Sequence, residues 1–74
     1  MSSTRDEWLG RYASLCGGST LDEEAMGYVL ELAGVAAHSS ERSAAPLACW
    51  IAAAAGLTPK DAFEFAKQIS EANE

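Results

Sequence analysis

The polar side chains that could do chemistry gather in one short stretch of the chain. His38 is the only histidine among 74 residues, and Glu41 and Arg42 follow it closely. The hydroxyl groups nearby belong to Ser39, Ser40 and Ser43. Catalysis by His38 would need a nucleophile or a second base within hydrogen-bond reach. Serines near a helix junction usually cap the helix instead, so we assign no catalytic residue.

Two interpretations of His38, Glu41 and Arg42 remain once catalysis is set aside. In the structural one, His38 meets the free carbonyl groups at the end of a helix, and Arg42 ties down the connection that follows. In the functional one, the three residues form a partner-binding site, because a basic spot on an acidic surface can orient a protein partner. Arg42 is the stronger candidate, since a guanidinium makes two-point hydrogen bonds to a carboxylate or phosphate.

No metal or cofactor site is predicted. Asp22, Glu23 and Glu24 are consecutive, whereas a calcium loop spreads its oxygen ligands along a loop with a glycine at the turn. These acids instead suit the first turn of a helix, where they complement the positive end of the helix dipole. Cys16 and Cys49 lack the spacing of a zinc site, and we expect two buried thiols.

The balance of charge excludes several classes of partner. Five Lys and Arg residues against eleven Asp and Glu residues give a net charge of −6. Such a surface repels nucleic acid, and it lacks the basic polar face with which interfacial helices bind anionic lipid. The first seven residues carry charges where a signal peptide needs an apolar run, so we expect a cytoplasmic protein.

Helix-capping signals divide the sequence into four helices. Residues 4–7 (Thr-Arg-Asp-Glu) form a capping box, in which the threonine and the glutamate each bond the other's backbone N–H, and Gly17 ends the helix that follows. Residues 20–23 (Thr-Leu-Asp-Glu) repeat this box. The apolar stripe that begins there predicts a long second helix that runs to about His38.

The third and fourth helices are marked by proline and glycine. Pro46 suits the first turn of the third helix, and Gly56 ends that helix. Thr58 is the predicted N-cap of the fourth helix, Pro59 its first residue, and Ser70 its approximate end.

The third helix sets the predicted fold. From Pro46 onward it has ten residues without a charged or polar side chain, so other helices must wrap it. Close approach of this helix at Gly27 and Gly34 would offset the cost of about 1 kcal/mol that each glycine imposes. We therefore predict an all-α, compact orthogonal four-helix bundle around a buried Ala-rich third helix, in a single domain of residues 1–74. The large side chains expected in its core are Trp8, Tyr12, Met26, Tyr28, Trp50, Phe63 and Phe65.

The stretch from Leu30 to Leu47, preceded by Trp8 and Leu9, resembles a small all-helical actinobacterial family of unknown function. Its members occur alone or as a C-terminal tail on enzymes similar to the molybdopterin guanylyltransferase of molybdenum cofactor synthesis. The shared residues are Val35, Ala36, His38, Arg42, Ala44, Ala45, Pro46 and Leu47. This chain differs by an extra Ala37 and by Ser43 where proline is common. The resemblance implies an association with cofactor synthesis and no catalytic residues, since the enzyme's phosphate-binding glycine loop is absent from this chain.

These observations predict a non-enzymatic accessory or protein-interaction domain, and the resemblance implies an association with biosynthesis of the molybdenum cofactor (molybdopterin guanine dinucleotide). The expected partner is a protein, with a molybdopterin guanylyltransferase as the candidate, and a homo-oligomer is left open. One alternative is a small self-associating structural protein of an unrelated pathway. Another is a small-molecule binder or hydrolase that uses His38.

Overall fold

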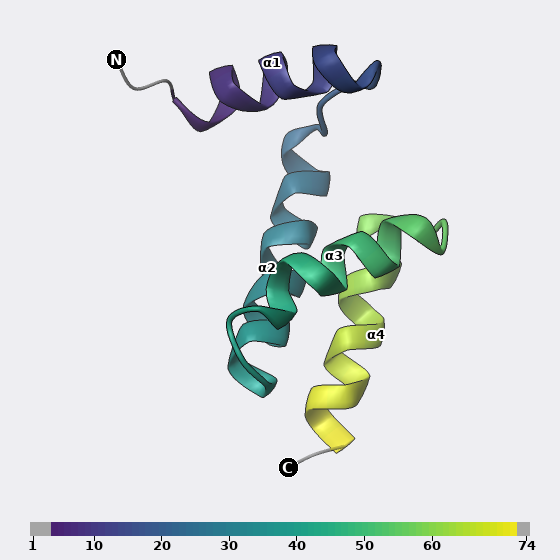
Figure 1. The fold of residues 1–74 in the computed structure, drawn as a ribbon. Coiled ribbons are helices and arrows are strands. Elements are labelled where there is room, and N and C mark those ends of the chain that lie inside the picture. The colour runs from purple at the N-terminus through teal and green to yellow at the C-terminus, as the bar shows by residue number, and fades with distance from the viewer. Residues whose placement is uncertain (1–3, 73–74) are drawn as a thin grey trace.

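Four helices make up the part of the chain that the structure describes, residues 4–72. In this computed structural model they are α1 (Arg5–Cys16), α2 (Glu23–Ser39), α3 (Ala44–Ala54) and α4 (Pro59–Ala72), arranged as in Figure 1. These residues contain no strand, and the predicted all-α class is confirmed. No helix among them is long and apolar enough to cross a membrane. Residues 1–3 and 73–74, which the expected domain of residues 1–74 includes, lie outside the described residues.

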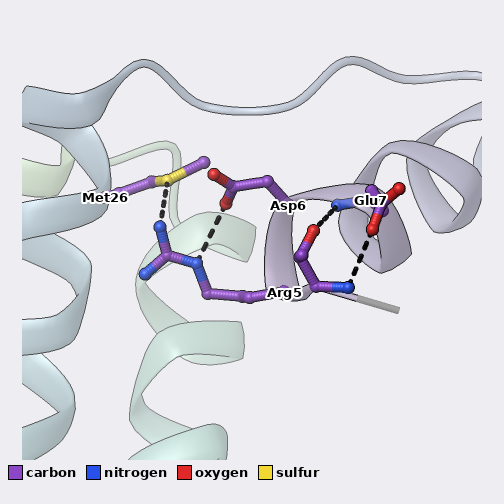
Figure 2. A network of polar contacts seen from close by, with 5 residues as sticks. Arg5, Asp6, Glu7 and Met26 are labelled. Atoms are coloured by element: carbon purple, nitrogen blue, oxygen red, sulfur yellow. Dashed lines mark hydrogen bonds and ion pairs between the residues drawn. The ribbon is translucent and has the colours of Figure 1, made fainter. Parts of the chain in front are cut away.

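Local hydrogen bonds fix both ends of α1. The Thr4 hydroxyl accepts the backbone N–H of Glu7 at 3.1 Å, and the Glu7 carboxylate accepts the backbone N–H of Thr4 at 3.0 Å. Figure 2 shows both bonds around Glu7. Gly17 ends the helix with a φ of 75°, a left-handed conformation that glycine adopts without strain. The capping box and the glycine stop predicted from the sequence are both confirmed.

The start of α2 differs from the prediction. Its N-cap is Asp22 rather than Thr20, and the Asp22 carboxylate accepts the backbone N–H of Ala25 at 2.8 Å. A carboxylate makes a stronger, charge-assisted bond than a hydroxyl, and the helix dipole favours it at this end. The helix therefore starts after Asp22. Its last residue is Ser39 and its C-cap is Ser40, close to the expected end.

The boundaries of α3 and α4 agree with the prediction. Pro46 lies in the first turn of α3, and Gly56 has a φ of 79° in the turn after that helix. The backbone N–H of Asp61 donates to the Thr58 hydroxyl at 3.2 Å, so Thr58 caps α4. Pro59 is the first residue of α4, where its missing N–H leaves no hydrogen bond unmade.

Packing is centred on α2. It contacts both α3 and α4, whereas α3 and α4 touch each other at few positions. In Figure 1, α1 lies across the N-terminal end of α2, and no Cα atom of α1 comes within 8 Å of one in α2, α3 or α4. A side chain does reach across, because the Arg5 guanidinium lies 3.7 Å from the Met26 sulfur (Figure 2). The helix α1 therefore stands largely apart from the other three.

Little of the chain is buried. Among residues 4–72 only Leu32 and Ala62 are buried, each 5% exposed. The prediction that the third helix is the buried axis of the bundle is wrong, because Trp50 on α3 is 75% exposed. Ala48 and Ala52 are half-buried, and each lines a cavity together with residues of α2 and α4. Only one side of α3 is packed, and no described element covers the other.

The large side chains expected in the core fall into two groups. Met26, Tyr28 and Phe63 are half-buried, and the rings of Tyr28 and Phe63 lie 6.0 Å apart between α2 and α4. The others are exposed, namely Trp8, Tyr12, Trp50 and Phe65. The predicted core is therefore right only where α2 and α4 meet, and it is wrong for α1 and α3.

Gly27 and Gly34 do not face a neighbouring backbone. A Cβ atom added at either position would meet no heavy atom within 4 Å, apart from the helix's own nearby backbone. The expected close approach of the third helix at these glycines is therefore wrong, and the surface of α2 is open there.

Candidate functional site

His38, Glu41 and Arg42 lie together at the junction between α2 and α3, and we call these three residues the corner. His38 is in the last turn of α2, and the other two precede α3. Two backbone hydrogen bonds hold this connection, from the Ala44 N–H to the Glu41 carbonyl at 2.9 Å and from the Ala45 N–H to the Arg42 carbonyl at 3.1 Å. All three side chains are exposed.

The polar side chains of the corner are exposed to solvent and have few partners. Glu41 accepts a hydrogen bond from the Ser43 hydroxyl at 3.3 Å. Within residues 4–72 the side chains of His38 and Arg42 make no hydrogen bond and no ion pair. The helix-end and loop-tying contacts of the structural interpretation are not made in this structure. The role of the corner in binding a partner stays a prediction.

A shallow groove begins at His38 and follows α2, and we call it the α2 groove. Its volume is ≈ 610 Å³, and its lining residues are Gly27, Leu30, Glu31, Gly34, Val35, His38, Ser39 and Ser70. All but Ser70, which comes from α4, belong to α2. Because Gly27 and Gly34 carry no side chain, a partner could come close to the α2 backbone there. Leu30 is an exposed apolar side chain in the same groove.

Outside the corner, the side chains that could do chemistry are dispersed. Cys16 is exposed, so the prediction of a buried thiol is wrong there, because α1 has no helix packed over it. Cys49 is half-buried, and this burial raises the pKa of its thiol because desolvation disfavours the thiolate. No group of three or more His, Cys, Asp or Glu residues within 4–72 is placed to hold a metal ion.

Two exposed apolar faces were not predicted from the sequence. The first lies on α1, and its members are Trp8, Tyr12 and Leu15. The rings of Trp8 and Tyr12 stack with their centroids 5.2 Å apart. The second lies on α3, and its members are Leu47, Trp50 and Ile51. The sequence does hold a signal for the second face, since the large side chains of that helix fall opposite Ala48 and Ala52, as in a helix packed only on its alanine side.

A family model matches nearly the whole chain. It describes a domain of unknown function, DUF6457, and the match covers residues 2–74. This range includes all four helices, the corner and the α2 groove. No curated protein and no solved structure matches the chain. The chain therefore belongs to the DUF6457 family.

Proposed function

We propose that this chain is a non-catalytic protein-interaction domain. The observation that carries the proposal is the amount of apolar surface left open. Two residues are buried, while ten large hydrophobic side chains are exposed within residues 4–72. Monomeric soluble proteins rarely expose apolar patches larger than a few hundred Å², and larger patches mark interaction sites. The lack of a hydrogen-bonded nucleophile or carboxylate beside His38 further supports a role without catalysis.

The partner site that we propose is the corner together with the α2 groove. Arg42 offers a planar set of donors for a carboxylate or phosphate group, and no described carboxylate competes for it. His38 joins the corner to the groove. Leu30 supplies an apolar contact further along the groove. This arrangement suits a protein segment that places an acidic group beside an apolar face.

The partner class that we propose is a molybdopterin guanylyltransferase or a protein similar to it. The resemblance of residues 30–47 to an actinobacterial family, whose members occur alone or as a C-terminal tail on such enzymes, supports this choice. That stretch contains the whole corner and most of the residues that line the α2 groove. The proposed setting is the cytoplasm, which suits a chain with two free thiols.

The proposal predicts that Arg42→Ala weakens binding of the guanylyltransferase from the same host by about tenfold or more, because a hydrogen bond to a charged group contributes about 1.5–3 kcal/mol. Isothermal titration calorimetry with the purified enzyme measures this change. The melting temperature should stay within a few degrees, because the exposed Arg42 side chain makes no hydrogen bond or ion pair within residues 4–72 that the substitution would remove.

The matched control is Arg11→Ala, which removes the same charge from an exposed position on α1. If both variants weaken binding equally, general electrostatic attraction explains the loss and the corner is not the site. If the enzyme binds neither the wild-type chain nor the variants, the proposed partner is wrong. Loss of stability in Arg42→Ala with binding intact would identify Arg42 as a structural residue.

A further inference from the structure

The exposed apolar faces of α1 and α3 lie outside the proposed partner site. On α1, Leu15 is 88% exposed and belongs to the same face as Trp8 and Tyr12. On α3, Ile51 is 68% exposed beside Trp50. Each face runs along one side of its helix at spacings of three or four residues, which is how helices present apolar stripes to a partner helix.

We propose that a second copy of this chain covers both faces, with α1 of each copy packed against α3 of the other in a symmetric dimer. A two-fold arrangement uses each face once in each copy, so the assembly closes at two chains. This inference goes beyond the proposed partner site and does not depend on that site, although six of the ten exposed hydrophobic side chains cited for the proposed function belong to these two faces. The two surfaces share no residues.

The chain exposes enough surface for a stable dimer interface. The chain exposes 5862 Å², whereas a folded monomer of its mass, 7.8 kDa, exposes about 4,400 Å². Its radius of gyration is 13.3 Å, against about 11 Å expected for a compact chain of this length. Two chains that bury all of this excess would form an interface of at most roughly 3,000 Å², and burying half of it would still exceed the roughly 1,000 Å² that a specific interface needs.

Charge supports self-association through these faces in particular. No residue of α3 is charged, and the two arginines of α1 offset its two acids, Asp6 and Glu7. The chain as a whole carries −6, so most other pairings of two copies would bring like charges together. Pairing α1 with α3 avoids this repulsion.

The form of α1 also suits docking as a unit. Its capping box and its glycine stop satisfy backbone groups at both ends of the helix with hydrogen bonds from within residues 4–18. The helices α1 and α3 have 12 and 11 residues, so both are about 17 Å long. A helix that is already formed loses little conformational entropy when it binds.

A pair of charge substitutions tests the pairing. Leu15→Lys on α1 and Ile51→Glu on α3 each place an unpaired charge in both halves of a homodimer. Each variant alone should therefore be a monomer of 7.8 kDa by light scattering, and the wild type at micromolar concentration should have twice this mass. An equimolar mixture should return to twice this mass, because one half pairs the new lysine with the new carboxylate and the other half is wild type.

Several outcomes would overturn the proposal. A wild-type chain that stays monomeric throughout the micromolar range is one. A mass that grows beyond two chains would overturn the symmetric closure. If Ile51→Glu is monomeric but Leu15→Lys remains dimeric, α3 pairs with itself and α1 has no part. A mixture that stays monomeric also contradicts the pairing of α1 with α3.

Two controls keep the test specific. Leu30→Glu adds the same charge at an exposed leucine of the α2 groove and should leave the dimer intact, although it should weaken binding at the partner site. Circular dichroism must show that each variant retains its helices. If Ile51→Glu does not, Ile51→Ser removes the apolar contact without adding charge. Failure of the dimer and failure of the partner site are thus measured separately.

Discussion

Glu7 sets the start of α1 through a single charged side chain. Its carboxylate accepts the backbone N–H of Thr4, and the Thr4 hydroxyl accepts the backbone N–H of Glu7. The backbone N–H of Thr4, and to a lesser degree the Thr4 hydroxyl, stabilise this carboxylate and hold the pKa of Glu7 below its ordinary value. The capping box is therefore strongest when Glu7 is ionised.

We expect the first turn of α1 to loosen in acid. A carboxyl group whose pKa is lower in the folded state stabilises that state above its unfolded pKa, and this contribution is lost as the pH falls through the lowered value. NMR shifts of the Glu7 carboxyl carbon and of the amide groups in the first turn should change together during this titration. In Glu7→Gln, which does not titrate, the amide shifts should stay constant. A matching change in that variant would show that another group is responsible.

At the scale of the element, α3 shows which features local sequence determines. Its boundaries follow from Pro46 and Gly56, and both could be predicted because a proline or glycine acts within one turn. Its burial could not, because burial depends on which other helices reach it. The helix that would have to cover Trp50 within the chain is α1, and α1 stands apart. The ten consecutive apolar residues from Pro46 onward therefore predicted a helix wrapped by others, and this prediction was wrong because no helix of the described chain covers the Trp50 side.

In the candidate site, too, some features could be predicted from the local sequence and others depend on how the helices pack. His38, Glu41 and Arg42 are close in sequence, so their closeness in space could be predicted from the helix boundary between them. The α2 groove could not, because Ser70 reaches it from α4 and because its open glycines depend on where α3 packs. The N-cap of α2 was also ambiguous, since Thr20 and Asp22 both offer a suitable acceptor and only one can begin the helix.

The packed and open faces of α3 predict losses of very different size for two truncations to alanine, one at Leu32 of α2 beneath the packed face and one at Trp50 on the open face. Leu32, against which the alanine face packs, is 5% exposed, so Leu32→Ala should cost about 2–5 kcal/mol of unfolding free energy. Trp50→Ala should cost no more than about 0.5 kcal/mol in dilute solution, because Trp50 is on the open face. Urea unfolding followed by circular dichroism measures both. A large loss in Trp50→Ala under dilute conditions would contradict the exposed placement of this side chain.

At the scale of the whole molecule, stability comes from a thin contact layer between α2 and its two neighbours. The described chain extends over 42 × 27 × 19 Å, with α1 at one end. Because this layer buries only two of the described residues, we expect a small free energy of unfolding. A change of about 1 kcal/mol is then a large fraction of the total stability. Small local changes in α2 should therefore be visible in the melting temperature of the entire chain.

Gly34→Ala is a change of this kind. Apart from the helix's own nearby backbone, a methyl group at this position meets no heavy atom within 4 Å. Alanine in a helix interior is more favourable than glycine by about 0.5–1 kcal/mol. The melting temperature should rise by about 4–8 °C for each kcal/mol gained. The same methyl group would lie in the α2 groove, so binding of the partner should weaken. Differential scanning calorimetry and titration calorimetry measure the two effects.

Gly10→Ala is the matched control, because it also adds a methyl group to open space but lies on α1, away from the groove. It should help its helix and leave partner binding unchanged. If Gly34→Ala instead binds as well as the wild type, the groove is not part of the interface.

If the α2 groove binds a partner as we propose, the open glycines of α2 set heat resistance against recognition within one helix. Alanine fits at Gly27 and Gly34 without a clash, so this chain is less stable than a near neighbour in sequence would be. A library of variants selected for thermal stability alone should accumulate alanine at both positions. The most heat-resistant members of that library would then be the ones that have lost their partner.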